Sequence, residues 1–293
     1  MSPLAFTRWI SGCFLILALS VLPLPAAETD SPGKPPGENA PDSPESFHLF
    51  LLVGQSNMAG RGVVEPQDLE PHPRVLVFTK EQTWAPAVDP LHFDKPAVVG
   101  VGPGRAFGLA VAKANPDITI GLIPCARGGS PISSWEPGAY HDQTDGYPYD
   151  EAIERARTAM RTGTLRGILW HQGEGDSTPE RARVYEKRLH ELVERFRKDL
   201  NAPEVPFIVG QLGKFETRPW SDAKKQVDAI HRDLPNHLPR TAFVSAEGLT
   251  DKGDHVHFDA RSSRELGERF AKAYLTLIEK ESPNPTESNI SRP

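Results

Sequence analysis

The sequence predicts an α/β sandwich, in which helices pack against a parallel β-sheet. Short, nearly continuous apolar runs recur along the chain, which is typical of strands that are covered on both faces. Between them lie segments with the apolar spacing of amphipathic helices. Because strand-like and helix-like patterns alternate, we expect parallel strands that are joined by helical crossovers.

The predicted strands and helices follow one another in a regular order. Apolar runs predict strands at residues 47–53, 74–78, 118–123, 167–172, 206–211 and 241–245. Helical spacing predicts helices at residues 106–114, 150–161, 179–200 and 262–279. The third helix is the clearest, since Pro179 suits a first helical position and either Ser177 or Thr178 suits the cap.

The N-terminal segment has the pattern of a signal peptide. Arg8 precedes an apolar run at residues 10–22, and small residues lead to a predicted cleavage site near Ala27. The run is shorter than the roughly 20 residues of a transmembrane helix. Cys13 comes before most of this run, which argues against a lipoprotein site. We therefore expect residues 1–27 to be a signal peptide and the protein to be secreted or periplasmic, with an uncleaved anchor as the alternative.

Composition separates one domain from its two flanks. Residues 28–46 and 281–293 are rich in proline and charge and lack apolar periodicity, which predicts a disordered linker and a disordered tail. Residues 47–280 are predicted to form a single domain.

After signal cleavage Cys125 is the one remaining cysteine, and we expect it to be a packing group. The net charge of −6, with mixed signs along the chain, argues against a nucleic-acid partner.

Polar residues follow three of the predicted strands at the point where each strand ends. Gln55, Ser56 and Asn57 follow the first strand; residues 127–130 follow the third, and residues 171–174 follow the fourth. Ligand sites in parallel sheets lie beyond the carboxyl ends of the strands. We therefore expect these three groups to converge on one rim of the sheet.

The rim and a later loop contain the residues of a serine hydrolase. A serine hydroxyl needs a base, which is usually a histidine that a carboxylate orients. Asp254 and His257 are three residues apart near the end of the domain, so they can pair in a tight loop. Each residue by itself is more often structural. A metal site at His255 and His257 lacks a third nearby ligand.

An acyl-transfer site also needs hydrogen-bond donors for the developing oxyanion. The sequence offers the backbone N–H of Ser56, the backbone N–H of Gly129 and the side-chain amide of Gln172. The alternatives are an ordinary turn at Gly129 and a hydrogen-bonded strand end at Gln172. Convergence on one rim favours the donor role for all three.

These segments resemble the SGNH/GDSL hydrolase superfamily. The likeness is closest to the carbohydrate esterase branch that holds acetylxylan esterases of family six and sialate O-acetylesterase-like domains. It spans residues 47–279 and rests on four ordered blocks, which read GQSNMAGRG, CARGGSPISSW, WHQGEGD and DHVHFDARSSRELGERF. The G-x-S-x-G elbow of ordinary α/β-hydrolases is absent.

The resemblance implies a fold and a set of roles. The fold is a three-layer α/β/α sandwich with a flavodoxin-like parallel sheet. Ser56 is implied as nucleophile and His257 as base, while Ser56, Gly129 and Gln172 form the oxyanion hole. Asp254 fits the D-x-x-H spacing of the superfamily, and Glu174 in WHQGEGD is the rival for orienting the histidine.

The implied activity is removal of O-acetyl groups from a carbohydrate without a metal or organic cofactor. Acetylxylan or a similar polysaccharide is the favoured substrate, and acetylated sialic acid stays open. The alternative from another class is a carbohydrate-binding module on an inactive esterase fold. Nothing in the sequence indicates an oligomeric state.

Several residues near the rim are candidates for substrate binding. Gln55 and Asn57 either hold their loop or touch the substrate. Arg105, like Arg61, either binds substrate hydroxyls or pins loops, and the sequence slightly favours pinning. Trp135 follows the Gly128–Gly129 segment, so we expect it to face a sugar.

Overall fold

The computed structural model describes residue 41, residues 43–215 and residues 218–281. The predicted signal peptide, the predicted linker up to residue 40 and the predicted tail beyond residue 281 lie outside the described residues. A turn at residues 44–46 precedes the first strand, and the Ser46 carbonyl oxygen accepts a hydrogen bond from the Thr119 N–H (2.8 Å).

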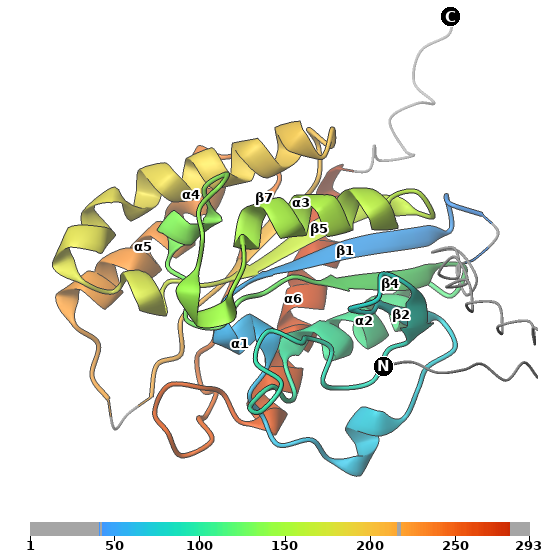
Figure 1. The fold of residues 1–293 in the computed structure, drawn as a ribbon, viewed down its shortest axis with the longest axis horizontal. Coiled ribbons are helices and arrows are strands. Elements are labelled where there is room, and N and C mark those ends of the chain that lie inside the picture. Colours follow the sequence, from blue (N-terminus) through green and yellow to red (C-terminus); the bar gives the residue numbers. More distant parts are fainter. Residues whose placement is uncertain (1–40, 42, 216–217, 282–293) are drawn as a thin grey trace, which may run out of the picture. The chain divides into compact units, whose positions relative to one another are not determined.

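Within the described residues, seven strands form a mostly parallel sheet (Figure 1), which confirms the predicted α/β class. The strands are β1 (Phe47–Gly54), β2 (Val75–Phe78), β3 (Trp84–Pro86), β4 (Thr119–Pro124), β5 (Thr164–His171), β6 (Phe207–Gly210) and β7 (Thr241–Val244). Their order is β3-β2-β4-β1-β5-β6-β7, and β3 alone pairs antiparallel. The first strand is therefore central, with β4 and β5 on either side, and the three predicted polar groups follow these three neighbours.

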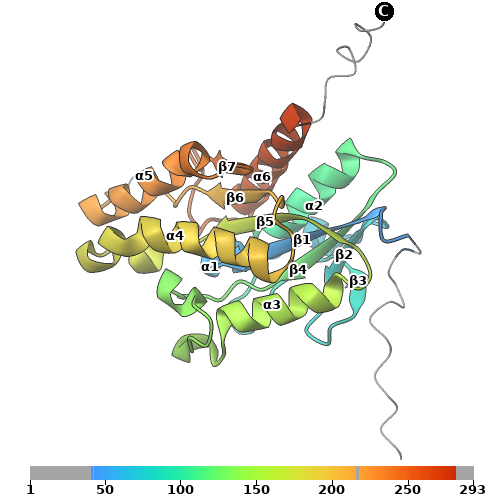
Figure 2. The same ribbon diagram turned by 90° about the horizontal axis from the view of Figure 1, so that it is seen from above.

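Helices cover both faces of the sheet. They are α1 (Ser56–Ala59), α2 (Pro103–Ala114), α3 (Pro148–Ala159), α4 (Pro179–Asp199), α5 (Asp222–His237) and α6 (Ala260–Glu281). The helices α2 and α6 pack on one face, while α3, α4 and α5 pack on the other (Figure 2). Short 3-10 helices are η1 (Pro66–Leu69), η2 (Ile132–Trp135), η3 (Asp142–Thr144) and η4 (Glu174–Asp176). This arrangement is the predicted three-layer sandwich.

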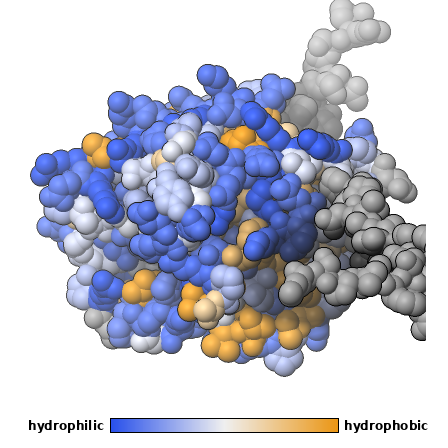
Figure 3. Space-filling model, viewed as in Figure 1, coloured by the Kyte–Doolittle hydropathy of each residue, from blue (hydrophilic) through white to orange (hydrophobic). Residues whose placement is uncertain are grey.

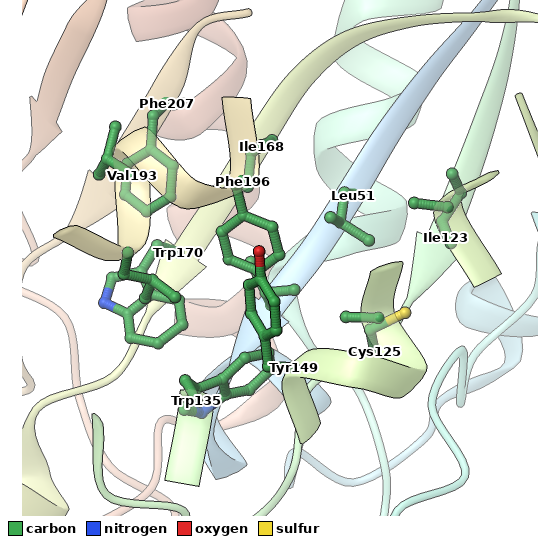
Figure 4. Packing of buried hydrophobic residues seen from close by; sticks show 14 of the residues in the cluster. Leu51, Ile123, Cys125, Trp135, Tyr149, Ile168, Trp170, Val193, Phe196 and Phe207 are labelled. Carbon is green, nitrogen blue, oxygen red and sulfur yellow. The ribbon is translucent and has the colours of Figure 1, made fainter. Parts of the chain in front are cut away.

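The central strand β1 contributes to two hydrophobic cores. Leu49, Leu51 and Val53 belong to the core under α3, α4 and α5, part of which Figure 4 shows. Phe50 and Leu52 point to the opposite core, under α2 and α6. Successive strand residues point to opposite faces, so a strand that is buried on both faces needs an uninterrupted apolar sequence. This is why the apolar runs indicated the strands correctly.

Trp135 lies inside the first core, so the prediction that it faces a sugar is wrong. Its side chain is 0% exposed, and its ring packs edge-on against Trp170 with the centroids 5.2 Å apart (Figure 4). Its indole N–H donates to Ser130 Oγ (3.0 Å). Cys125 is buried in the same core, and burial raises the pKa of its thiol. This confirms Cys125 as a packing group.

Two α-helices and one strand were not predicted, and neither were the short 3-10 helices. The four-residue helix α1 and the three-residue antiparallel strand β3 are too short to show a period. The helix α5 has a usable signal, because the Ser221 side chain caps it by accepting from the Lys224 N–H (3.2 Å) and Val227 and Leu234 are buried at helical spacing. Its many charged residues and Pro235 in its last turn obscure this pattern.

The surface in the view of Figure 3 is largely hydrophilic, with small scattered apolar patches. No helix in the described part of the chain is long and apolar enough to cross a membrane.

Candidate active site

The short helix α1, which begins at Ser56, lies directly beyond the carboxyl end of the central strand β1 (Figure 1). The strand ends at Gly54, whose φ of +128° suits glycine and whose absent side chain leaves room for the His171 carbonyl oxygen. The Gln55 N–H then donates to that carbonyl (2.8 Å), and α1 begins at Ser56. The tight turn holds the Ser56 hydroxyl at the rim, between the ends of β4 and β5.

Two aspartates fold the loop that follows β7. Asp251 Oδ1 accepts hydrogen bonds from the N–H groups of Gly253 (2.7 Å) and His255 (3.0 Å). Asp254 Oδ1 accepts from the N–H groups two and three residues later, at 3.0 and 2.8 Å. Such side-chain to backbone bonds are the usual way in which aspartate stabilises a turn. The loop therefore has a defined shape before any substrate is bound.

The structure brings Asp254, His257 and Ser56 together in one hydrogen-bonded chain. Asp254 Oδ2 is 2.7 Å from His257 Nδ1, and His257 Nε2 is 3.0 Å from Ser56 Oγ. Burial alone would raise the pKa of Asp254, but hydrogen bonds from the imidazole and from two backbone N–H groups outweigh it and lower the pKa to about 2. The charged carboxylate holds the proton on Nδ1, so Nε2 can accept the hydroxyl proton.

The Asn57 side chain fixes the position of His257 by bonding to both of its neighbours. Asn57 Nδ2 donates to the Val256 carbonyl (3.1 Å), and Asn57 Oδ1 accepts from the Phe258 N–H (3.1 Å). Asn57 Nδ2 also donates to Glu174 Oε1 (2.7 Å). Because this amide follows the serine directly, it links the nucleophile turn to the histidine loop. Its polar atoms are occupied inside the protein, which makes it a positioning residue and not a substrate ligand.

Glu174 acts on this arrangement through Asn57 and not through the histidine. Its Oε1 accepts from Asn57 and lies 4.0 Å from the Nδ1 of His171, whereas the carboxylate that bonds His257 is that of Asp254. Burial lowers the pKa of His171, so that imidazole is neutral. The geometry thus favours Asp254 over its rival, and it gives Glu174 the task of orienting the Asn57 amide.

Gln55 holds the loop after β5. Its Oε1 is 3.2 Å from the Gly175 N–H and 3.5 Å from the Gly173 N–H, and its side chain is buried. This arrangement places Gln55 under the rim, where it shapes the Glu174 segment. Of the two predicted alternatives, this arrangement matches the loop-holding role and not contact with the substrate.

Two backbone N–H groups are available for an oxyanion. In the part of the chain that the structure describes, the N–H groups of Ser56 and Gly129 have no hydrogen-bond acceptor. The preceding N–H, that of Gly128, donates to Asp94 Oδ2 (2.8 Å), and Arg61 Nη2 donates to the same oxygen (2.7 Å). The Arg61–Asp94 pair therefore anchors the loop that presents Gly129. Asp94 was not predicted, since its partners lie 33 and 34 residues away.

Gln172 does not match its predicted role as an oxyanion donor. Its Nε2 donates to Asp176 Oδ2 (2.6 Å) and to the Ser130 carbonyl (3.1 Å), so both amide hydrogens are used. Its Oε1 accepts from the Tyr185 hydroxyl (2.9 Å). A fully buried amide is most stable when all of its polar atoms are paired. Gln172 therefore stabilises the Gly128–Ser130 loop through its hydrogen bond to the Ser130 carbonyl.

Arg105 also lies away from the candidate site. It sits in the first turn of α2 and is buried, with Nε donating to the Ala87 carbonyl (3.1 Å) and Nη2 donating to the Glu70 carbonyl. These bonds pin two loops, so the predicted role in substrate binding is wrong and the pinning alternative holds. Arg61 likewise pins a loop, as its bond to Asp94 shows.

Replacing Gly129 by alanine is expected to lower kcat for p-nitrophenyl acetate by about 10- to 100-fold, because it disturbs one oxyanion donor. Gly129 has a φ of +83°, and a side chain there would meet Gln143. Gly138 has a similar φ of +71° but open space around it, so Gly138→Ala is the matched control. Both changes strain the backbone by about 1–2 kcal/mol. Equal kcat values for the two variants would contradict the oxyanion role.

Comparisons with known proteins show to which family the chain belongs. The family model described as carbohydrate esterase, sialic acid-specific acetylesterase, matches residues 46–276. A probable carbohydrate esterase of Arabidopsis thaliana is 31% identical over 264 residues, which cover 82% of this chain and 96% of the relative. A probable 9-O-acetyl-N-acetylneuraminic acid deacetylase of Escherichia coli is 26% identical over 269 residues, covering 73% of this chain and 81% of the relative.

Solved structures share the fold. An Arabidopsis thaliana protein superimposes with a TM-score of 0.70 at 31% identity, covering 80% of this chain and 99% of that chain. NanS superimposes with a TM-score of 0.62 at 20% identity, covering 81% of this chain and 99% of that chain, which shows the fold alone. The resemblance read from the four sequence blocks is thereby confirmed. The chain belongs to the carbohydrate esterase family of sialic acid-specific acetylesterases.

Proposed function

We propose that this protein is a serine esterase that removes O-acetyl groups from carbohydrates. The observation that carries the proposal is the hydrogen-bonded chain from Asp254 through His257 to Ser56, beside two backbone N–H groups that have no acceptor among the described residues. Membership of a carbohydrate esterase family supports ester hydrolysis on a sugar. A catalytically inactive carbohydrate-binding module would have no need to keep this geometry.

In the proposed reaction, Ser56 Oγ attacks the acetyl carbonyl carbon while His257 Nε2 takes the hydroxyl proton. The N–H groups of Ser56 and Gly129 bind the oxyanion of the tetrahedral intermediate. When the ester bond breaks, His257 gives its proton to the departing sugar oxygen. Water then attacks the acetyl-enzyme, His257 takes a proton from it, and acetate leaves as Ser56 regains its hydrogen.

The proposed substrate is an acetylated polysaccharide such as acetylxylan, as the sequence suggests. The Escherichia coli relative is named for 9-O-acetyl-N-acetylneuraminic acid, which makes an acetylated sialic acid the second candidate. We also propose that the protein is exported, because residues 1–27 have the pattern of a signal peptide.

Acetate release tests the proposal directly. The panel is acetylated xylan, 9-O-acetyl sialic acid, p-nitrophenyl acetate and p-nitrophenyl octanoate, and labelling by a serine-reactive phosphonate is mapped by peptide mass spectrometry. We expect cleavage of p-nitrophenyl acetate and at least one acetylated sugar, with the label on Ser56. A protein that releases no acetate and takes no label would be a binding module, and preference for the octanoate would indicate a lipase.

A further inference from the structure

A small hairpin lies against the loop that presents the Gly129 N–H. His141 and Gly146 form its antiparallel bridge, where the His141 N–H donates to the Gly146 carbonyl (2.8 Å), and η3 forms its tip. His141 Nε2 is 3.4 Å from the Gly128 carbonyl oxygen, and the Gln143 side chain fills the space beside the Gly129 Cα. The hairpin therefore packs against the loop that carries the proposed oxyanion donor.

Two tyrosines flank the bridge and expose their rings. The Tyr140 and Tyr147 centroids are 5.3 Å apart with the rings at 63°, and the residues are 48% and 46% exposed. The Tyr140 hydroxyl donates to the Asp145 carboxylate, and the Tyr147 N–H donates to Glu151 Oε1 (2.8 Å). The first bond fixes the Tyr140 ring, and the second fixes the backbone that carries the Tyr147 ring. The two rings thus form one exposed aromatic surface.

This surface differs from the rest of the described residues. Among the large apolar and aromatic side chains that those residues leave exposed, Tyr140 and Tyr147 are the aromatic ones, and both lie on this hairpin. The tryptophans of the described core, by contrast, are buried: Trp84, Trp135 and Trp170. Tyrosines whose apolar rings are exposed side by side are well suited to contact a ligand, because each ring also carries a polar tip.

We infer that Tyr140 and Tyr147 form a subsite for a sugar ring of the substrate. This inference rests on the proposed function, since it needs a carbohydrate ester as ligand. A pyranose ring has a face of C–H groups that packs on an aromatic ring, while its hydroxyls stay in water. Tyrosine suits this contact because it combines a rigid apolar ring with a polar tip.

The place of the pair defines which part of the substrate it holds. The hairpin contacts the Gly128–Gly129 loop, which would bind the acetyl oxygen, and the two rings contact each other on this hairpin. The subsite therefore receives a sugar ring next to the one that carries the reacting ester. It would select oligomeric glycans over small esters.

The test compares kcat/KM for a glycan ester with kcat/KM for p-nitrophenyl acetate, which has no sugar. The glycan probes are acetylated xylotetraose and 9-O-acetyl sialyllactose. For Tyr140→Ala and Tyr147→Ala we expect this ratio to fall about tenfold, through a higher KM for the better glycan, since aromatic contacts are worth roughly one tenfold step. Tyr147→Phe keeps the ring and should restore the ratio.

The control is Val184→Ala, which removes a side chain that is 43% exposed on α4, and it should change neither rate. If the wild-type enzyme cleaves p-nitrophenyl acetate and both alanine variants keep the wild-type ratio of the two kcat/KM values, the subsite is refuted and the proposed function stays intact. The subsite is also refuted if neither glycan has a lower wild-type KM than p-nitrophenyl acetate. Absence of all ester hydrolysis refutes the proposed function and the subsite with it.

Discussion

Replacing Ser56 by alanine is expected to lower kcat for p-nitrophenyl acetate by about 10⁴-fold or more, since loss of a serine nucleophile leaves only the oxyanion donors and substrate binding. The change removes one oxygen from a residue that is 7% exposed and whose Oγ bonds His257. The fold should therefore be kept. Steady-state kinetics measures the loss of kcat, and far-UV circular dichroism checks that the fold is kept.

The matched control is Ser134→Ala. Ser134 is also buried, at 5% exposed, and its hydroxyl donates to the Pro131 carbonyl (2.7 Å) in η2, away from His257. Its variant should retain activity close to that of the wild type. If Ser56→Ala keeps a substantial share of the wild-type rate, Ser56 is not the nucleophile, whatever Ser134→Ala does.

Replacing Asp254 by asparagine is expected to lower kcat by about 10²- to 10⁴-fold. An asparagine amide can donate to His257 Nδ1, which moves the imidazole proton to Nε2 and leaves Ser56 without a base. The matched variant is Glu174→Gln, which keeps an oxygen acceptor for Asn57 and should cost no more than about tenfold. Kinetics on folded variants separates the two carboxylates. The reverse order of effects would make Glu174 the partner of the histidine.

The acidic side of the pH profile follows from the same pair. The pKa of Asp254 is lowered to about 2, so this carboxylate stays charged throughout an assay between pH 4 and 9. Protonation of Asp254 therefore does not explain a loss of rate within this range, whereas a histidine base has to be neutral to accept the serine proton. Because the pKa of Asp254 is lower in the folded state than in the unfolded state, the charged carboxylate stabilises the fold above about pH 4. This stabilisation is lost as the pH falls towards 2. A kcat/KM that does not change between pH 5 and 8 would contradict a histidine base.

The sequence predicted the fold because its main determinants are local. The apolar runs at residues 47–53 and 118–123 need no partner to be recognised, since any strand that is buried on both faces has this composition. The pairing of Asp254 with His257 is local too, as three residues of a turn are enough to bring the two side chains together. The convergence of the polar groups followed from a rule about parallel sheets, and here the strands β4, β1 and β5 are neighbours.

The roles that were missed depend on contacts between distant segments. Asn57 was ambiguous because its partners lie 117 and 199 residues away, and those partners make it a clamp on the histidine loop. Gln172 was predicted as an oxyanion donor, but its amide bonds the Ser130 carbonyl, 42 residues away, as well as the nearer Asp176 and Tyr185. The contacts of Asn57 and Ser130 follow no spacing pattern in the sequence.

Side-chain exposure at the rim was likewise decided by tertiary structure. Trp135 and Tyr140 lie in the same segment, and either ring could face a sugar by sequence alone. The core under α3 and α4 buries the tryptophan against Trp170, while the bridge between His141 and Gly146 turns the tyrosine outwards.

The sequence by itself determined the α/β class, the serine turn and the Asp254–His257 pair, because those depend on composition and short spacing. Only the tertiary structure decided which polar groups stay free at the rim, because burial and hydrogen-bond satisfaction depend on segments that meet in the folded chain.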